Sequence, residues 1–86
     1  MEINKLIEIV KEKISKKIIL QEINVEDKSI LHKDHKNNSP NKFHIKISII
    51  SYELTPKKKI DSTKRIYKIL ENELKNHIHS IQLSIN

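Results

Sequence analysis

The sequence predicts an α+β domain in which two helices cover one face of a three-stranded sheet. Two segments repeat apolar residues every three or four positions, and three others are rich in β-branched residues. Their order along the chain is helix, strand, strand, helix, strand, which is typical of helices packed on one side of a small sheet. A chain of 86 residues has the size of one domain with a modest core, so residues 1–86 are expected to form a single domain.

The first half of the chain predicts one helix, one strand and one long connection. Residues 2–17 predict a helix because five apolar side chains recur on one face. These side chains are Ile3, Leu6, Ile7, Val10 and Ile14. Residues 18–25 form a β-branched run typical of a strand. Residues 26–42 are polar and bear histidines, and a polar connection this long in a small domain is usually either functional or disordered.

Residues 43–52 form the clearest predicted strand, because apolar and polar residues alternate along it. The apolar face carries Phe43, Ile45, Ile47 and Ile49. The other face carries His44, Lys46 and Ser48, so we expect His44 to be a solvated surface residue. A turn containing Pro56 is expected to follow at residues 53–59.

A second helix and a last strand complete the predicted fold. Asp61 or Ser62 is expected to cap the helix at its start. Asn76 is expected to end it in the left-handed geometry that glycine usually adopts. In the last strand, alternation places His79 on the same apolar side as Ile81.

The composition excludes several classes of function. Without glycine the chain has neither a phosphate-binding loop nor a dinucleotide-binding turn, because both need a close approach of backbone to phosphate. Without cysteine it has no disulfide and no thiolate metal site of its own. No apolar run has the length of a membrane span, and the N-terminus lacks the pattern of a secretory signal. We therefore expect a cytoplasmic protein, and an organellar location would require a presequence that was removed.

The net charge of +6 and the pI near 9.6 raise the question of nucleic acid binding. Lysine is spread over the whole chain, and one local cluster stands out. It consists of Lys57, Lys58 and Lys59, with Lys64 and Arg65 beyond them. A solvated turn and helix start is the ordinary interpretation of such a cluster.

Four segments, in this order, resemble the BolA family. Residues 27–35 (DKSILHKDH) resemble its D-x-S-x-x-H-x-x-H loop, and residues 43–51 (FHIKISIIS) its H-F-x-V-x-V-V-S strand. Residues 67–74 (YKILENEL) resemble its Y-x-x-L-x-x-E-L helix, and residues 77–81 (HIHSI) its x-V/I-H-A-L ending. The resemblance covers nearly the whole chain and implies the type II KH-like fold of that family.

The resemblance also implies a function and a set of metal ligands. BolA proteins are partners of CGFS-type monothiol glutaredoxins, with which they share a 2Fe-2S cluster that also involves glutathione, in cluster trafficking, cluster maturation or iron sensing. The family's C-terminal histidine ligand falls on His79, and its loop ligand falls on His32 with His35 as a nearby competitor. The expected protein is not an enzyme, is a monomer when free and forms a heterodimer with its partner.

A nucleic-acid-binding transcriptional regulator is the alternative function, and it would use the KH-like fold and the basic surface. The family's R-H-R motif falls here on Ser62, Thr63 and Lys64, so two of its three positions are lost. A glycine-free chain also lacks the G-x-x-G loop with which KH domains hold a nucleic acid backbone. The sequence has no recognisable pair of nucleophile and base, which argues against an enzymatic function.

Overall fold

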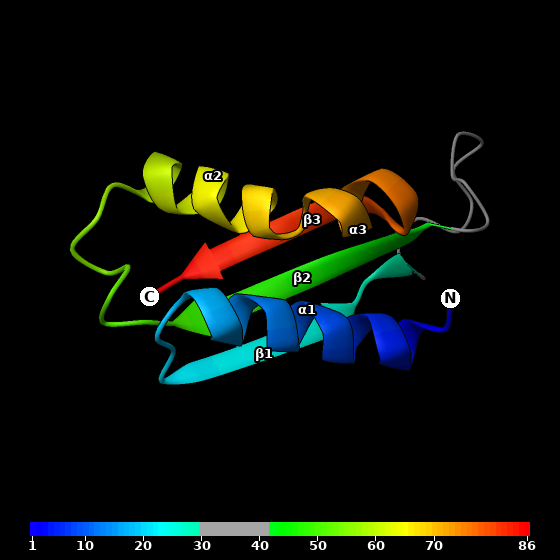
Figure 1. The fold of residues 1–86 in the computed structure, drawn as a ribbon, viewed down its shortest axis with the longest axis horizontal. Coiled ribbons are helices and arrows are strands. Elements are labelled where there is room, and N and C mark those ends of the chain that lie inside the picture. The colour runs from blue at the N-terminus through cyan, green and yellow to red at the C-terminus, as the bar shows by residue number, and fades with distance from the viewer. Residues whose placement is uncertain (30–41) are drawn as a thin grey trace.

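The computed structural model describes residues 1–29 and 42–86 and has the predicted α+β architecture (Figure 1). Its elements are α1 (Ile3–Lys17), β1 (Glu22–Asp27), β2 (Phe43–Ile50), α2 (Lys59–Ile69), α3 (Glu71–Asn76) and β3 (Ile78–Ile85). The strand order is β1-β2-β3, with β1 antiparallel and β3 parallel to the central strand β2. Helices α2 and α3 therefore form the crossover that a parallel strand pair requires. None of the helices within residues 1–29 and 42–86 has the length and hydrophobicity of a membrane span.

The apolar core lies between the helices and one face of the sheet. Its centre is β2, where the alternate residues Ile45, Ile47 and Ile49 are buried. The other buried apolar residues are Leu6, Val10, Ile14, Ile18, Val25, Leu54, Ile66, Leu70 and Ile78. The predicted apolar faces of the first helix and of β2 are thus confirmed.

Strand β1 begins at Glu22, four residues after the predicted start. Ile18 is buried in the core, and its N–H still bonds to the Ile14 carbonyl at 2.9 Å. The Ser51 hydroxyl donates to the Ile19 carbonyl at 2.7 Å. This side chain therefore provides a hydrogen-bond partner for a carbonyl group that lies outside the sheet. The first β-branched residues therefore close the end of α1 and connect it to the sheet.

The predicted second helix is divided into α2 and α3 at Leu70. The backbone of Leu70 has φ −97° and ψ 16°, outside the α-helical region. Its N–H nevertheless bonds to the Ile66 carbonyl at 3.0 Å, and its carbonyl accepts from the Leu74 N–H at 2.8 Å. Because these bonds continue across the break, α2 and α3 form one helical arm over the sheet.

Both predicted caps of this helical arm are wrong. The N-cap is Lys58, and the N–H groups of Asp61 and Ser62 already bond to its carbonyl at 3.1 Å, which places both residues inside the first turn. No non-glycine residue among the described ones has a positive φ. Asn76 instead closes α3 with its side chain, whose Nδ2 donates to the carbonyl and to Oδ1 of Asn72 at 3.0 Å each.

A buried carboxylate on α3 ties this helix to α1. Glu73 is only 4% exposed, and its Oε2 lies 2.6 Å from Nζ of Lys13. Burial by itself raises the pKa of Glu73, but hydrogen bonds from Lys13 and from a backbone N–H, together with the Lys13 charge, outweigh burial and hold the pKa below its usual range. The Glu73 carboxylate is therefore ionised at neutral pH and paired across the two helices.

We expect Lys13→Met to lower the free energy of unfolding by about 2 kcal/mol at pH 7. Removing one partner of a fully buried ion pair costs about 3–5 kcal/mol, and the loss here is smaller because the Lys13 side chain is 40% exposed. A carboxylate whose pKa is lowered by folding stabilises the fold above its unfolded pKa, about 4.3. The difference between variant and wild type should therefore shrink as the pH falls through and below that value.

Urea unfolding at pH 7 and at about pH 3 measures this difference. Lys16→Met is the matched control, because Lys16 pairs with the exposed Glu12 one helical turn away. It should change stability little at either pH. Equal losses for the two variants would contradict a special role of the Glu73 pair.

Candidate metal centre

His79 lies at a β-bulge near the start of β3. Phe43 pairs with Ile78, whereas the next pair along the two strands is His44 with Ser80, so His79 is the extra residue. A bulge breaks strict alternation and re-aims the side chain next to it. Ile78 is consequently buried in the core, at 2% exposure, and His79 is exposed. The prediction that His79 lies on the apolar side of the strand is therefore wrong.

The His79 ring packs beside the ring of His44 from the neighbouring strand. Their centroids are 4.7 Å apart with the ring planes tilted by 59°, and His79 Nδ1 lies 3.2 Å from His44 Nε2. The second ring nitrogen of His44, Nδ1, lies 2.6 Å from the Ser80 hydroxyl oxygen. His44 is only 7% exposed, so the prediction of a solvated surface residue is wrong. Both residues that follow Ile78 in the bulge thus contact one buried imidazole.

The backbone of His44 is held by the segment that resembles the family's D-x-S loop. The Ser29 N–H donates to Oδ1 of Asp27 at 2.9 Å, which forms a tight local turn. The Ser29 hydroxyl then accepts from the His44 N–H at 3.1 Å, and the His44 carbonyl accepts from the Lys28 N–H at 2.7 Å. The end of β1 therefore fixes the residue that supports His79.

The other predicted ligands, His32 and His35, lie outside the described residues. His77 is the C-cap of α3, with its N–H bonded to the Glu73 carbonyl at 2.7 Å. Within residues 1–29 and 42–86, no group of three or more His, Asp or Glu side chains is placed to hold a metal ion. What the described residues bring together is a pair of imidazoles, of which only that of His79 is exposed.

The motifs and the fold now agree with one family. The family model described as BolA-like protein matches residues 14–86. The chain belongs to the BolA-like family. A comparison with curated proteins finds no match.

Solved structures support this assignment at the level of the fold. The BolA domain of SufE1 from Arabidopsis thaliana is 27% identical, covering 90% of this chain and 85% of that one, with a TM-score of 0.76. BolA1 from Arabidopsis thaliana is 22% identical, covering 93% and 88%, with a TM-score of 0.78. A bol-like protein from Babesia bovis is 18% identical, covering 92% and 80%, with a TM-score of 0.69. The predicted fold class is therefore confirmed.

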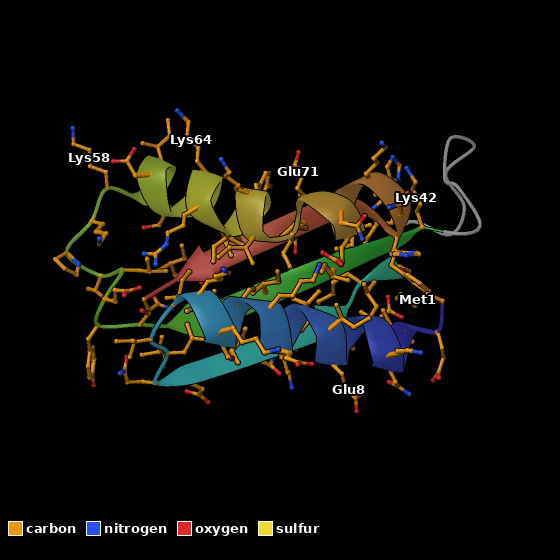
Figure 2. All side chains as sticks on the ribbon, viewed as in Figure 1. Met1, Glu8, Lys42, Lys58, Lys64 and Glu71 are labelled. Carbon is orange, nitrogen blue, oxygen red and sulfur yellow. The ribbon has the colours of Figure 1, made fainter. Side chains whose placement is uncertain are left out.

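The basic cluster of this BolA-like chain lies at the opposite end of the molecule from His79. Figure 2 shows Lys58 and Lys64 at the start of α2, whereas Lys42 marks the other end, where β2 begins. Because β3 runs parallel to β2, His79 lies at the Lys42 end. Lys57, Lys58, Lys59 and Lys64 are all exposed. The lysines considered for nucleic acid binding and the proposed metal ligand His79 therefore lie on separate surfaces.

Arg65, the fifth candidate for nucleic acid binding, has a structural role. Its Nη2 donates to the Lys17 carbonyl at 2.8 Å, at the end of α1, and its Nη1 lies 3.1 Å from Oε2 of Glu53. A guanidinium at a helix C-terminus satisfies a free carbonyl and complements the helix dipole. Arg65 therefore joins the two helices through these contacts.

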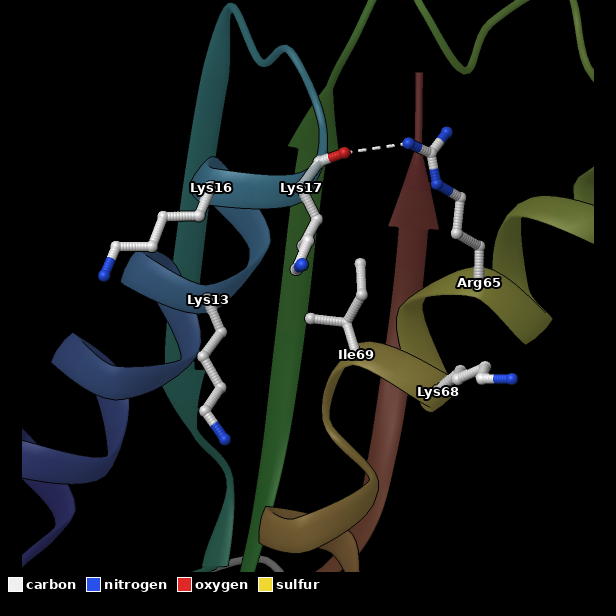
Figure 3. A pocket seen from close by; sticks show the side chains of 6 residues that line it. All are labelled: Lys13, Lys16, Lys17, Arg65, Lys68 and Ile69. Atoms are coloured by element: carbon white, nitrogen blue, oxygen red, sulfur yellow. Dashed lines mark hydrogen bonds between the residues drawn. The ribbon is translucent and has the colours of Figure 1, made fainter.

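A basic cleft between α1 and α2 was not predicted from the sequence (Figure 3). Its volume is about 530 Å³, and it is lined by Lys13, Lys16, Lys17, Arg65, Lys68 and Ile69. Lys13, Lys16 and Arg65 are already engaged with carboxylates. The lysines of the cleft are point charges, which favour anions in general and distinguish little between one base and another.

Any affinity of the protein for duplex DNA should consequently be independent of sequence and sensitive to salt. We expect fluorescence anisotropy to give equal affinities for unrelated duplexes, with binding lost between about 50 and 200 mM salt. Replacing Lys57, Lys58 and Lys59 together by serine should reduce the slope of log affinity against log salt. Sequence-selective binding that persists at about 150 mM salt would refute this prediction.

Proposed function

We propose that this BolA-like chain is a non-enzymatic adaptor that shares a 2Fe-2S cluster with a CGFS-type monothiol glutaredoxin. The pair would act in cluster trafficking, cluster maturation or iron sensing. The observation that carries the proposal is the exposed imidazole of His79, held at a β-bulge by the buried His44. It occupies the position to which the family's C-terminal histidine ligand carries over.

The chemistry of the donor set fits a cluster held by two proteins. Such a cluster is usually bound by four thiolates, and histidine replaces cysteine in some of them. This chain contains no cysteine, so it would contribute imidazole, while the glutaredoxin cysteine and glutathione would contribute thiolate. The family resemblance offers His32 or His35 as a second imidazole. When bound, the cluster would supply one-electron chemistry at a potential raised by its histidine ligands.

The residues of the chain perform the binding and positioning part of this function. His79 is exposed at one end of the sheet, while the hydrogen bonds of Ser29 and Lys28 hold the neighbouring His44 backbone in place. A ligand whose orientation is set before metal arrives binds more tightly than a mobile one. The net charge of +6 also favours encounter with an anionic assembly of cluster, thiolates and glutathione.

The first test is anaerobic reconstitution of the full chain with iron and sulfide, with and without a CGFS glutaredoxin and glutathione. We expect the chain alone to remain a colourless monomer, because it has no thiolate. With both additions, size-exclusion chromatography should give a heterodimer with visible absorption. Stable visible absorption from the chain reconstituted alone would contradict the shared-cluster proposal.

The second test assigns the ligand. His79→Ala should abolish or greatly shorten the lifetime of the shared cluster, because it removes the exposed imidazole. The fold should lose only about 1 kcal/mol, the contribution of one hydrogen bond, which corresponds to roughly 4–8 °C in the thermal midpoint of a domain of this size.

His77→Ala is the matched control, since it removes a histidine two residues earlier in the same segment. It should leave the cluster lifetime close to that of the wild type. If His79→Ala kept its cluster as well as the control, or failed to fold, the ligand assignment would be wrong.

A further inference from the structure

Three polar groups at the bulge form a continuous chain of contacts. Ser80 Oγ lies 2.6 Å from His44 Nδ1, and His44 Nε2 lies 3.2 Å from His79 Nδ1. Both ring nitrogens of His44 are therefore engaged, and this ring is 7% exposed. His79 is exposed, and among the described residues nothing is hydrogen-bonded to its Nε2. His44 is thus poorly placed to bind a metal itself and well placed to hydrogen-bond to His79, the proposed ligand.

Hydrogen-bond chemistry allows two proton arrangements when both rings are neutral, because facing ring nitrogens at this distance share one proton. In the first, the Ser80 hydroxyl donates to His44 and His44 donates to His79, which leaves the proton of His79 on Nε2. In the second, Nδ1–H of His79 donates to Nε2 of His44, and Nδ1–H of His44 donates to the Ser80 oxygen. The second arrangement leaves a lone pair on Nε2 of His79. Both arrangements hold the same number of protons.

We propose that His44, supported by Ser80, is a positioning residue that keeps His79 in the Nδ1–H tautomer and makes its Nε2 the ligating atom. The inference rests on the proposed function, in which His79 is the ligand. Metal-binding histidines almost always donate their second ring N–H to a fixed acceptor, which orients the ring and increases its basicity as a ligand. His44 supplies such an acceptor.

The acceptor is fixed because His44 is held from three sides. Its N–H donates to Ser29 Oγ at 3.1 Å, its carbonyl accepts from Lys28 at 2.7 Å, and its Nδ1 contacts Ser80. Free imidazole in water prefers the Nε2–H tautomer, so this surrounding structure would reverse the intrinsic preference of His79. That reversal can be observed without any metal or partner.

The test is long-range ¹H–¹⁵N NMR of the free protein labelled at histidine, at a pH well above the usual imidazole pKa of about 6.5 so that both rings are neutral. The wild type should show His79 protonated at Nδ1. In His44→Leu the acceptor is gone, so His79 should return to the Nε2–H form. In His44→Gln the amide oxygen replaces the acceptor, and the Nδ1–H form should be retained.

Two further variants keep the result independent of folding defects. Lys46→Leu introduces the same side chain at the next position on the same face of β2, and it should leave the His79 tautomer unchanged. Ser80→Ala removes only the distal acceptor and should give a mixture of the two tautomers. An Nε2–H form in the wild type, or the same tautomer in wild type and His44→Leu, would overturn the proposal.

The reconstituted heterodimer with a CGFS glutaredoxin provides a second readout. Competition with a chelator should show about 10- to 100-fold weaker cluster retention for His44→Leu, the usual effect of losing the partner of a metal-binding histidine, and rescue by His44→Gln. If the free His44→Leu variant keeps the wild-type tautomer of His79 while the wild-type heterodimer holds its cluster, only the positioning role is refuted. A heterodimer that never takes a cluster refutes the proposed function, even where the tautomer behaves as expected.

Discussion

The parallel pairing of β2 with β3 is the constraint on which the candidate site depends. Parallel strands begin at the same edge of a sheet, so the first residues of both strands become neighbours although 35 positions separate them. An antiparallel β3 would carry His79 to the far end of the sheet from His44. The crossover through α2 and α3 is therefore as important for the site as the histidines themselves.

The bulge allows the start of β3 to supply both a core residue and the exposed histidine of the site. Counted back from Ile81, strict alternation would bury His79 and expose Ile78. The register shift between Phe43 and His44 keeps Ile78 in the core and leaves two successive residues to contact His44. Because of this one extra residue, β3 contributes the Ile78 side chain to the core and the His79 imidazole to the surface at the start of the strand.

Much of the fold could be predicted because its elements obey simple periodicities. Leu6, Val10 and Ile14 recur every four residues and are buried, and the alternation of β2 matches its buried face. The start of β1 could not be placed, because buried β-branched residues such as Ile18 look alike in a strand and in the segment that closes a helix. The break at Leu70 has no proline or glycine to mark it.

The candidate site could be predicted only in part, for a different reason. A motif identified His79, but alternation within a strand tells which face a residue occupies and not what lies across from it. His44 lies on the face away from the helices, which was expected to be solvated, yet it is buried beside Ser80, His79 and the segment around Ser29. The parallel topology was the available signal, since it places the starts of both strands together.

The absence of glycine gives the molecule a common way of ending its elements. Side chains donate hydrogen bonds to carbonyl groups near the ends of the elements. The Asn76 side chain donates to the Asn72 carbonyl, and the Ser51 hydroxyl donates to the Ile19 carbonyl. The turn of Asp27 and Ser29 follows the same rule. A chain without glycine has less conformational freedom to lose on folding. At the histidine edge the consequence is specific, because the turn that ends β1 also holds the backbone of the residue against which His79 is oriented.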